Sequence, residues 1–366
     1  MSHADAIAAA TQTVPANGAP PIPLVSSLVV DTAGEAVVAV CRQVLADGMD
    51  YRSSAQSMNA HKRIREILNC TVALRTPARR IADCTAPGFA FSPGLAAARF
   101  LYLLSGSDSY EQIAFYTNGA SRFAGGGRSL PGSAYGARLF TGQANMFEET
   151  ARTLLARPNT KRASVPIFQP HDTLAARHTP DLPCAFGLHF MLRDAGLISS
   201  VTMRANDAFK IMPYNLFEFS LLAECMAARI GVAYAAHVHG SVSMHLRDEG
   251  IAAAERLEDS ALAPRAMPPV DVFNEDLRAA VCAVEAEIRA QGRGSRPERV
   301  LDRLSALPEN GPWHDLLVAA SLAGAAADGR GARAAEAMAP VAAARGDDLP
   351  LTAGEIARLL GGPPPA

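Results

Sequence analysis

Two short apolar runs joined by a turn predict a β-hairpin in the middle of the chain. Every second residue is a large apolar one between 187 and 192, as in a strand with one buried face. Residues 194–196 (Asp-Ala-Gly) are a turn signal, and a second run covers 197–203. A ribbon of this length returns Arg204 close to Cys184.

Apolar residues at helical spacing predict helices on both sides of this hairpin. Pro213 opens one helix, and Gly231 ends it after apolar residues at every third or fourth position. Asn274 is the expected N-cap of another, at 274–291. Further helices are predicted at 36–45, 95–104, 146–156, 316–327 and 332–344, and strands at 66–74 and 165–168. This mixture predicts an α/β fold that ends in alanine-rich helices.

The chain divides into three expected parts. Residues 1–24 are small, polar and punctuated by proline, which predicts disorder. Residues 25–255 carry the alternating strands and helices, and we expect them to form the α/β domain. Residues 256–366 are expected to form a helical C-terminal extension.

Composition excludes several classes of protein. The chain has 366 residues, 49% of them hydrophobic, which suits one large domain with a small appendage. The net charge of −2 gives no excess of positive charge of the kind that binds nucleic acid, and no apolar run is long enough to span a bilayer. The six cysteines form no CxxC pair, and no signal peptide is visible. We therefore expect a cytoplasmic protein with reduced thiols that binds neither nucleic acid nor membrane.

Three motifs follow one another around the hairpin. Asp181-Leu182-Pro183-Cys184 precedes it, Arg204-Ala205-Asn206-Asp207-Ala208-Phe209 ends it, and Pro213-Tyr214-Asn215 opens the next helix. In this order they resemble the core of thymidylate synthase and of the related pyrimidine nucleotide hydroxymethylases. The resemblance runs from about Val38 to His245. It implies a large mixed sheet flanked by helices, in a homodimer.

The resemblance also implies a reaction: one-carbon transfer, as methylation or hydroxymethylation, from 5,10-methylenetetrahydrofolate to C5 of a pyrimidine nucleotide monophosphate. Cys184 would be the nucleophile, because a thiolate added at C6 makes C5 an enamine-like carbon. Tyr135 would help the proton leave C5, and Asn215 would read the base edge. Arg204 would either stabilise the thiolate or bind the phosphate. A buried structural cysteine is the alternative for Cys184.

Other positions take their expected roles from the same resemblance. Lys161 and Arg162 match paired cations that reach the phosphate of the other subunit in the dimer. Asp207 matches the aspartate that hydrogen-bonds the folate pterin. Ser243 and His245 stand in the sugar-binding segment, which usually reads Gly-Asp-x-His-x-Tyr and here reads Gly-Ser-Val-Ser-Met-His. The altered segment suggests an unusual nucleotide.

Some positions depart from the family pattern. Arg99 stands where the family carries a glutamate for proton relay, and an arginine cannot act as an acid or base near neutral pH. Our hypothesis is that Arg99 binds an extra anionic or hydroxyl group of the substrate. The single tryptophan, Trp313, lies outside the catalytic motifs, and the family's C-terminal closing peptide is not recognisable. Both changes should admit water, which favours a hydroxymethyl product.

Two alternatives remain open. The chain could be a nucleotide-binding homologue that has lost the transfer chemistry, as the replacement at Arg99 would allow. His237, His239 and His245 raise the alternative of a metal site, but no carboxylate or cysteine spacing completes it. We therefore expect no metal.

Overall fold

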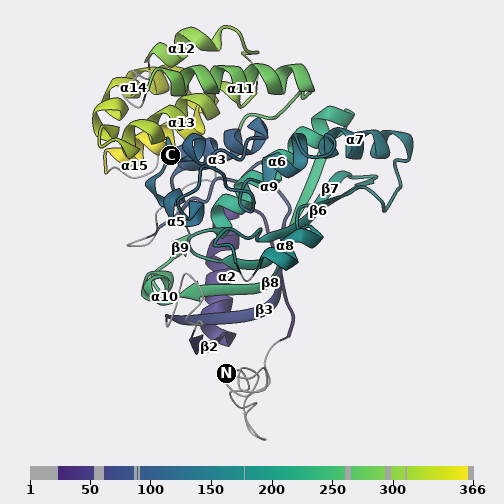
Figure 1. Ribbon diagram of the computed structural model, residues 1–366. Coiled ribbons are helices and arrows are strands. Elements are labelled where there is room, and N and C mark those ends of the chain that lie inside the picture. The colour runs from purple at the N-terminus through teal and green to yellow at the C-terminus, as the bar shows by residue number, and fades with distance from the viewer. Residues whose placement is uncertain are drawn as a thin grey trace, which may run out of the picture.

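A mixed β-sheet runs through the middle of the molecule (Figure 1). The computed structural model describes residues 24–52, 62–85, 89, 91–176, 178–259, 265–292, 298–309 and 311–361. The expected disordered segment, up to residue 23, and residues 362–366 lie outside this part. Seven strands form the sheet in the order β1-β3-β8-β7-β6-β5, with β2 paired to β3. Two neighbouring pairs, β1/β3 and β7/β8, are parallel and the others antiparallel.

The strands of this sheet are β1 (Ser26–Val30), β2 (Met49–Arg52), β3 (Arg63–Leu74), β5 (Ser164–Pro166), β6 (Ala185–Arg193), β7 (Gly196–Asp207) and β8 (Tyr234–Arg247), and β4 (Cys84–Thr85) pairs separately with β9 (Glu258–Asp259). The helices are α2 (Ala33–Asp47), α3 (Pro93–Ser105), α4 (Tyr110–Ala114), α5 (Ser121–Ala124), α6 (Tyr135–Phe140), α7 (Met146–Ala156), α8 (Pro170–Ala175), α9 (Met212–Ile230), α10 (Asp248–Ala254), α11 (Glu275–Ala290), α12 (Glu298–Leu304), α13 (Trp313–Ala327), α14 (Gly331–Arg345) and α15 (Pro350–Leu359). The predicted large mixed sheet flanked by helices is confirmed.

The predicted hairpin is present as β6 and β7. The strands are antiparallel, and Arg193 pairs with Gly196 at the turn. At the open end, the Arg204 amide donates a hydrogen bond to the Cys184 carbonyl at 2.7 Å. The ribbon therefore brings the two predicted site residues together, as the alternation and the turn signal indicated.

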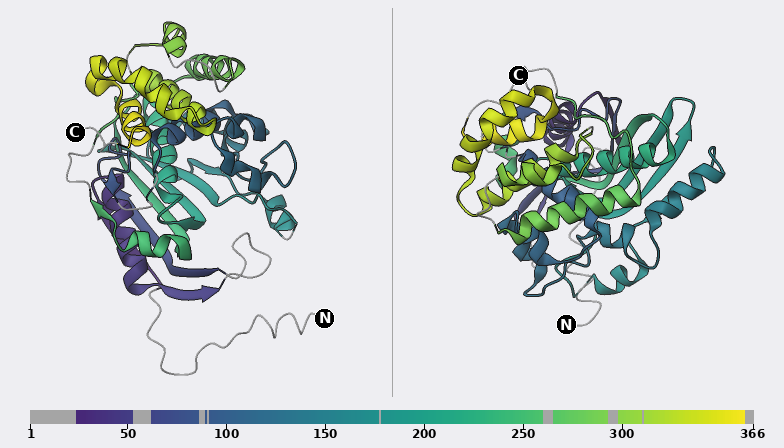
Figure 2. Two further views of the ribbon diagram at one scale, coloured as in Figure 1. Left: turned by 90° about the vertical axis from the view of Figure 1, so that its left-hand side faces the viewer. Right: turned by 90° about the horizontal axis from the view of Figure 1, so that it is seen from above.

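Helices cover one face of the sheet and leave the other open. Helices α2 and α9 contact strands β3, β7 and β8, and α2 and α9 lie along the sheet in Figure 2. Along β7, Val201 and Met203 point into the core, whereas Thr202 is exposed. Val242 on the neighbouring strand β8 is 43% exposed, and Val29 on the edge strand β1 is 65% exposed. This exposed surface, the open sheet face, carries apolar side chains that no described helix covers.

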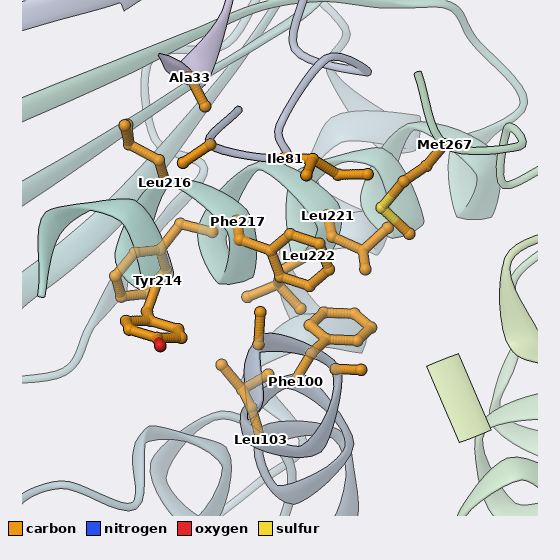
Figure 3. Packing of buried hydrophobic residues seen from close by; sticks show 14 of the residues in the cluster. Ala33, Ile81, Phe100, Leu103, Tyr214, Leu216, Phe217, Leu221, Leu222 and Met267 are labelled. Carbon is orange, nitrogen blue, oxygen red and sulfur yellow. The ribbon is translucent and has the colours of Figure 1, made fainter. Parts of the chain in front are cut away.

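The core continues between α9 and α3. Phe217 and Leu221 of α9 are fully buried and point toward Phe100 and Leu103 of α3 (Figure 3). Helix α3 begins at Ser92, whose hydroxyl accepts from the Leu95 amide. These contacts fix the two helices that carry Arg99 and Asn215.

The C-terminal helices pack on the α/β domain rather than apart from it. Helix α13 contacts α3, and Trp313 at its start stacks on Phe273. Glu355 of α15 accepts hydrogen bonds from the Ser92 hydroxyl at 2.9 Å and the Gly94 amide at 3.1 Å, at the first turn of α3. The extension thus supports the helix that carries Arg99. No helix in the described residues is long and apolar enough to cross a membrane.

Asp315 joins α13 to α15, and we expect it to matter for stability. Its carboxylate is fully buried and accepts from the Leu351 and Thr352 amides, both at 2.8 Å, in the first turn of α15. Asp315→Ala should lower the free energy of unfolding by about 2 kcal/mol, because two buried amides lose their acceptor. Chemical denaturation measures the change, and unaltered stability would show that solvent replaces these bonds.

The same carboxyl predicts a pH dependence. Burial raises the pKa of Asp315 from 3.8 to about 6. Between these values the folded state holds a proton that the unfolded state has released, so stability falls as pH rises from about 4 to about 6 and is then constant. Subtracting the free energy of unfolding of Asp315→Asn from that of the wild type, at each pH, isolates this slope. A difference that does not change with pH would contradict the prediction.

Candidate active site

Cys184 lies at the start of β6 beside a guanidinium. Its Sγ is 3.5 Å from Nη2 of Arg204, and the thiol is half-buried. Arg204 Nε also donates to the Pro183 carbonyl at 2.8 Å, and Nη2 to the Leu182 carbonyl at 3.3 Å. The arginine therefore fixes the loop that presents the thiol and is placed to stabilise a thiolate.

Tyr135 is held against the same loop. Asp181 accepts from the amides of Gly132 and Ser133 at 2.7 and 3.1 Å. A Cβ on Gly132 would lie 2.3 Å from the Asp181 carbonyl oxygen, so only glycine allows this approach. Three residues on, the Tyr135 hydroxyl accepts from the Cys184 amide at 3.2 Å. Burial, reinforced by the nearby Cys184 thiol, raises the pKa of Tyr135 above its ordinary value.

Arg99 forms an ion pair with Glu218 across α3 and α9. The Glu218 side chain is 4% exposed and that of Arg99 30%. The guanidinium also lies 5.3 Å from the centroid of the Tyr214 ring. Burial opposes the charge on Arg99, but the pairing with Glu218 raises its pKa above the ordinary value. Phe219, the residue after Glu218 on α9, stacks on the Tyr135 ring with 5.8 Å between the centroids, and the charge of Glu218 contributes to the raised pKa of Tyr135.

Glu218 is the functional candidate that sequence reasoning missed. It stands alone among apolar residues on the buried side of α9, in the run Asn215-Leu-Phe-Glu-Phe. A lone carboxylate at a core position needs a partner, since an unpaired buried charge is costly. That signal was visible in the sequence, although the identity of the partner was not.

Asn215 lies in the first turn of α9, 2% exposed. Its Nδ2 donates to Oδ1 of Asn206 at 3.1 Å, and Asn206 Nδ2 lies 2.7 Å from Nε2 of His239. The amide that is predicted to read the base is therefore held by Asn206 of β7, which is in turn held by His239 of β8.

Ser243, His245 and Asp207 gather at the ends of β7 and β8. In the sheet register His245 pairs with Asp207 and Ser243 with Ala205, the residue after Arg204. Burial lowers the pKa of His245. Ser243 bonds Glu66 of β3 and lies 3.4 Å from His245 Nδ1. The two predicted sugar contacts thus lie on the Arg204 side of the site.

Asp207 is largely engaged within the protein. Its Oδ1 accepts from the Phe209 and Lys210 amides at 3.1 and 2.9 Å. Its Oδ2 is buried, 3.2 Å from Arg247 Nε, but neither atom has a partner with hydrogen-bond geometry among the described residues. One carboxylate oxygen is therefore left as an acceptor.

Lys161 and Arg162 do not join this cluster. Both are exposed in the loop between α7 and β5, where the Thr160 hydroxyl accepts from the Arg162 amide at 3.1 Å. The metal hypothesis also gains nothing, since the described part of the chain holds no group of three His, Cys, Asp or Glu residues placed for a metal ion.

Comparison with known proteins identifies this arrangement. Residues 122–279 match the family model described as thymidylate synthase. The predicted resemblance to the thymidylate synthase family is confirmed over this part of the chain. Over 197 residues it is 28% identical to the deoxyuridylate hydroxymethyltransferase of Bacillus phage SP01, covering 50% of this chain and 51% of that protein.

A second relative is a putative thymidylate synthase of Methanocaldococcus jannaschii. It is 26% identical over 104 residues, which cover 28% of this chain and 47% of that protein. The chain spans about half the length of both relatives. The family match includes Tyr135, Cys184, Arg204 and Asn215, whereas Arg99 precedes it.

Proposed function

We propose that the chain transfers a one-carbon unit to C5 of a pyrimidine nucleotide monophosphate through a covalent adduct at Cys184. The observation that carries the proposal is the position of the Cys184 thiol, which lies 3.5 Å from the Arg204 guanidinium. The backbone amide of Cys184 also donates a hydrogen bond to the Tyr135 hydroxyl. When the thiolate bonds to C6, the ring electrons move toward C5 and O4, and C5 becomes nucleophilic. Elimination of the thiolate later restores the ring.

The C5 proton must leave before that elimination, and Glu218 is the carboxylate available. It is buried and paired with Arg99, and the next residue on α9, Phe219, stacks on Tyr135. A carboxylate in this position can act as the general base for the C5 proton. In this role Arg99 is a positioning residue that holds Glu218, which we propose in place of our hypothesis that it binds an anionic or hydroxyl group of the substrate.

The donor proposed for the reaction is 5,10-methylenetetrahydrofolate. The buried Oδ2 of Asp207, which lacks a hydrogen-bonding partner among the described residues, is an acceptor that suits the N–H groups of a pterin. Bound there, the folate would supply the one-carbon unit. Arg247, 3.2 Å from the same oxygen, would balance the charge of Asp207.

The proposed substrate is a uracil nucleotide. Asn215 offers a carboxamide, which matches the N3–H and O4 of uracil, and the phage relative is named for deoxyuridylate. Arg204 is suited to the phosphate as well as to the thiolate. Ser243 and His245 would contact the sugar, because they pair in the sheet with residues that follow Arg204 on β7.

We propose a homodimer that pairs the open sheet face. Val29 on β1 and Val242 on β8 are exposed apolar side chains on that face, and exposed apolar surface marks an interaction site. The loop of Lys161 and Arg162 leads directly into β5, the edge strand of the same sheet. Two exposed cations at that edge are well placed to reach the phosphate in a partner subunit.

We expect a hydroxymethylated base as the product. Trp313 stacks on Phe273 at the start of α13, and none of the described site contacts involves a tryptophan that would shield the reacting carbon from water. Incubation with UMP, dUMP, CMP and dCMP plus methylenetetrahydrofolate, followed by mass spectrometry of the base, tests this. A methylated base with an equal amount of dihydrofolate would contradict hydroxymethylation and favour the reaction that the archaeal relative's name suggests.

The second candidate is a nucleotide-binding protein without transfer activity. The Arg99–Glu218 ion pair favours it, because the carboxylate is already engaged by a guanidinium. Release of tritium from C5-labelled nucleotides separates the two functions. Binding without release by the wild type would establish the second candidate.

A further inference from the structure

A line of buried amide and imidazole groups runs behind the proposed base reader. Asn215 Nδ2 donates to Asn206 Oδ1 at 3.1 Å, and Asn206 Nδ2 lies 2.7 Å from His239 Nε2. The three side chains come from α9, β7 and β8, and they are 2%, 2% and 0% exposed. We call these three residues the amide relay.

The relay has one direction. An amide nitrogen can only donate, so Asn206 Nδ2 requires His239 Nε2 to be an acceptor. That requires a neutral imidazole, and burial lowers the pKa of His239 to about 4, which keeps it neutral near pH 7. With its Nδ2 given to His239, Asn206 has only its Oδ1 to offer Asn215. The Nδ2 of Asn215 is therefore held on the side that faces Asn206, and its Oδ1 points the other way.

We propose that Asn206 and His239 are specificity-determining residues that fix the orientation of the Asn215 amide, so that the site reads one pyrimidine base and rejects the other. The inference rests on the proposed function only in taking Asn215 as the base reader. Held by one N–H, Asn215 presents its Oδ1 and its second N–H in a set order. The edge of uracil (N3–H donor, O4 acceptor) and that of cytosine (N3 acceptor, N4 donor) are complementary to opposite orders.

Accepting the wrong base would require the Asn215 amide to turn over. The carbonyl oxygen of Asn215 would then face Oδ1 of Asn206, two acceptors in contact in a buried site. Asn206 could turn as well only if His239 moved its proton to Nε2 from Nδ1, which has no hydrogen-bond partner among the described residues, so all three groups would have to reverse together. Turning Asn215 alone leaves an unsatisfied buried polar group, which costs enough to weaken binding on the order of 10- to 100-fold, and this penalty is what makes the amide selective.

Two substitutions at one position test the relay. Aspartate can only accept hydrogen bonds, so Asn206→Asp still holds Asn215 by its Nδ2, while His239 shifts its proton to Nε2 and donates. Asn206→Leu has a similar size and cannot bond Asn215. Titration calorimetry with UMP and CMP gives the ratio of the two dissociation constants for each protein, independently of catalysis.

The relay predicts that wild type and Asn206→Asp share one ratio within about threefold, while in Asn206→Leu the ratio falls toward one by roughly 10- to 100-fold. Thermal unfolding checks that each variant is folded, and His239→Phe carries the same expectation as Asn206→Leu if the latter does not fold. Equal binding of the two bases by wild type would overturn the inference. So would an unchanged ratio in Asn206→Leu, or an equal loss in Asn206→Asp. Tritium release is measured separately, so an inactive wild type that still discriminates would reject the proposed function and keep the relay.

Discussion

Cys184→Ser should abolish the covalent adduct with a 5-fluoro-pyrimidine nucleotide and methylenetetrahydrofolate while leaving the fold intact. A serine hydroxyl is a far weaker nucleophile than a thiolate, and Arg204, 3.5 Å from the sulfur, stabilises a thiolate that serine cannot form. We expect one-carbon transfer to fall on the order of 10³-fold or more. Intact-protein mass spectrometry detects the adduct, because fluorine at C5 cannot leave as the proton does.

Cys282 provides the matched control. It is the other half-buried thiol, and burial raises its pKa to about 11, so it is protonated near pH 7. Cys282→Ser should form the adduct as wild type does, and peptide mapping should place the nucleotide on Cys184. Transfer at the wild-type rate by Cys184→Ser would show that the proposed mechanism is wrong.

The hairpin could be predicted because its signals are local. Alternation with a period of two and an Asp-Ala-Gly turn indicate both strands and their register from the turn back to the pair Gly187–Thr202. A register shift between Ala185 and Gly187, which the sequence did not indicate, then sets the Arg204 amide on the Cys184 carbonyl. The N-cap at Asn274 was readable, and its side chain does accept from the Leu277 amide. Sequence reasoning could therefore place the chemistry near the open end of the ribbon, but not its exact register there.

Contacts between distant segments were not within reach. Arg99 and Glu218 lie 119 residues apart, and nothing near either one indicates the other. Short elements such as α4 and α8 bury too few residues to leave a periodic pattern. The support of α3 by Glu355 also depends on how the C-terminal helices pack, which no local pattern encodes.

Substitutions in the Arg99–Glu218 pair should separate adduct formation from proton removal. Glu218→Gln keeps the shape of the side chain but cannot take the C5 proton. We expect the 5-fluoro adduct still to form at Cys184, while tritium release from C5 of the preferred nucleotide falls by roughly 10²- to 10⁴-fold. The expectation follows from the burial of Glu218 at 4% exposure and from its place beside Phe219, which stacks on Tyr135.

The control for the Glu218 experiment is another ion pair on the same helix. Glu148 of α7 accepts from Arg229 of α9 at 2.8 Å and is also mostly buried. Glu148→Gln should change stability slightly and leave tritium release unaltered. If Glu218 served only to hold Arg99, Glu218→Gln would lower adduct formation and tritium release together. The exchanged double variant, Arg99→Glu with Glu218→Arg, restores the ion pair and moves the carboxylate to α3, the position at which the resemblance to thymidylate synthases predicts a glutamate. Greater tritium release by the double variant than by Glu218→Gln would show that the reaction needs a carboxylate between these helices, and equal release would show that the position on α9 is what matters.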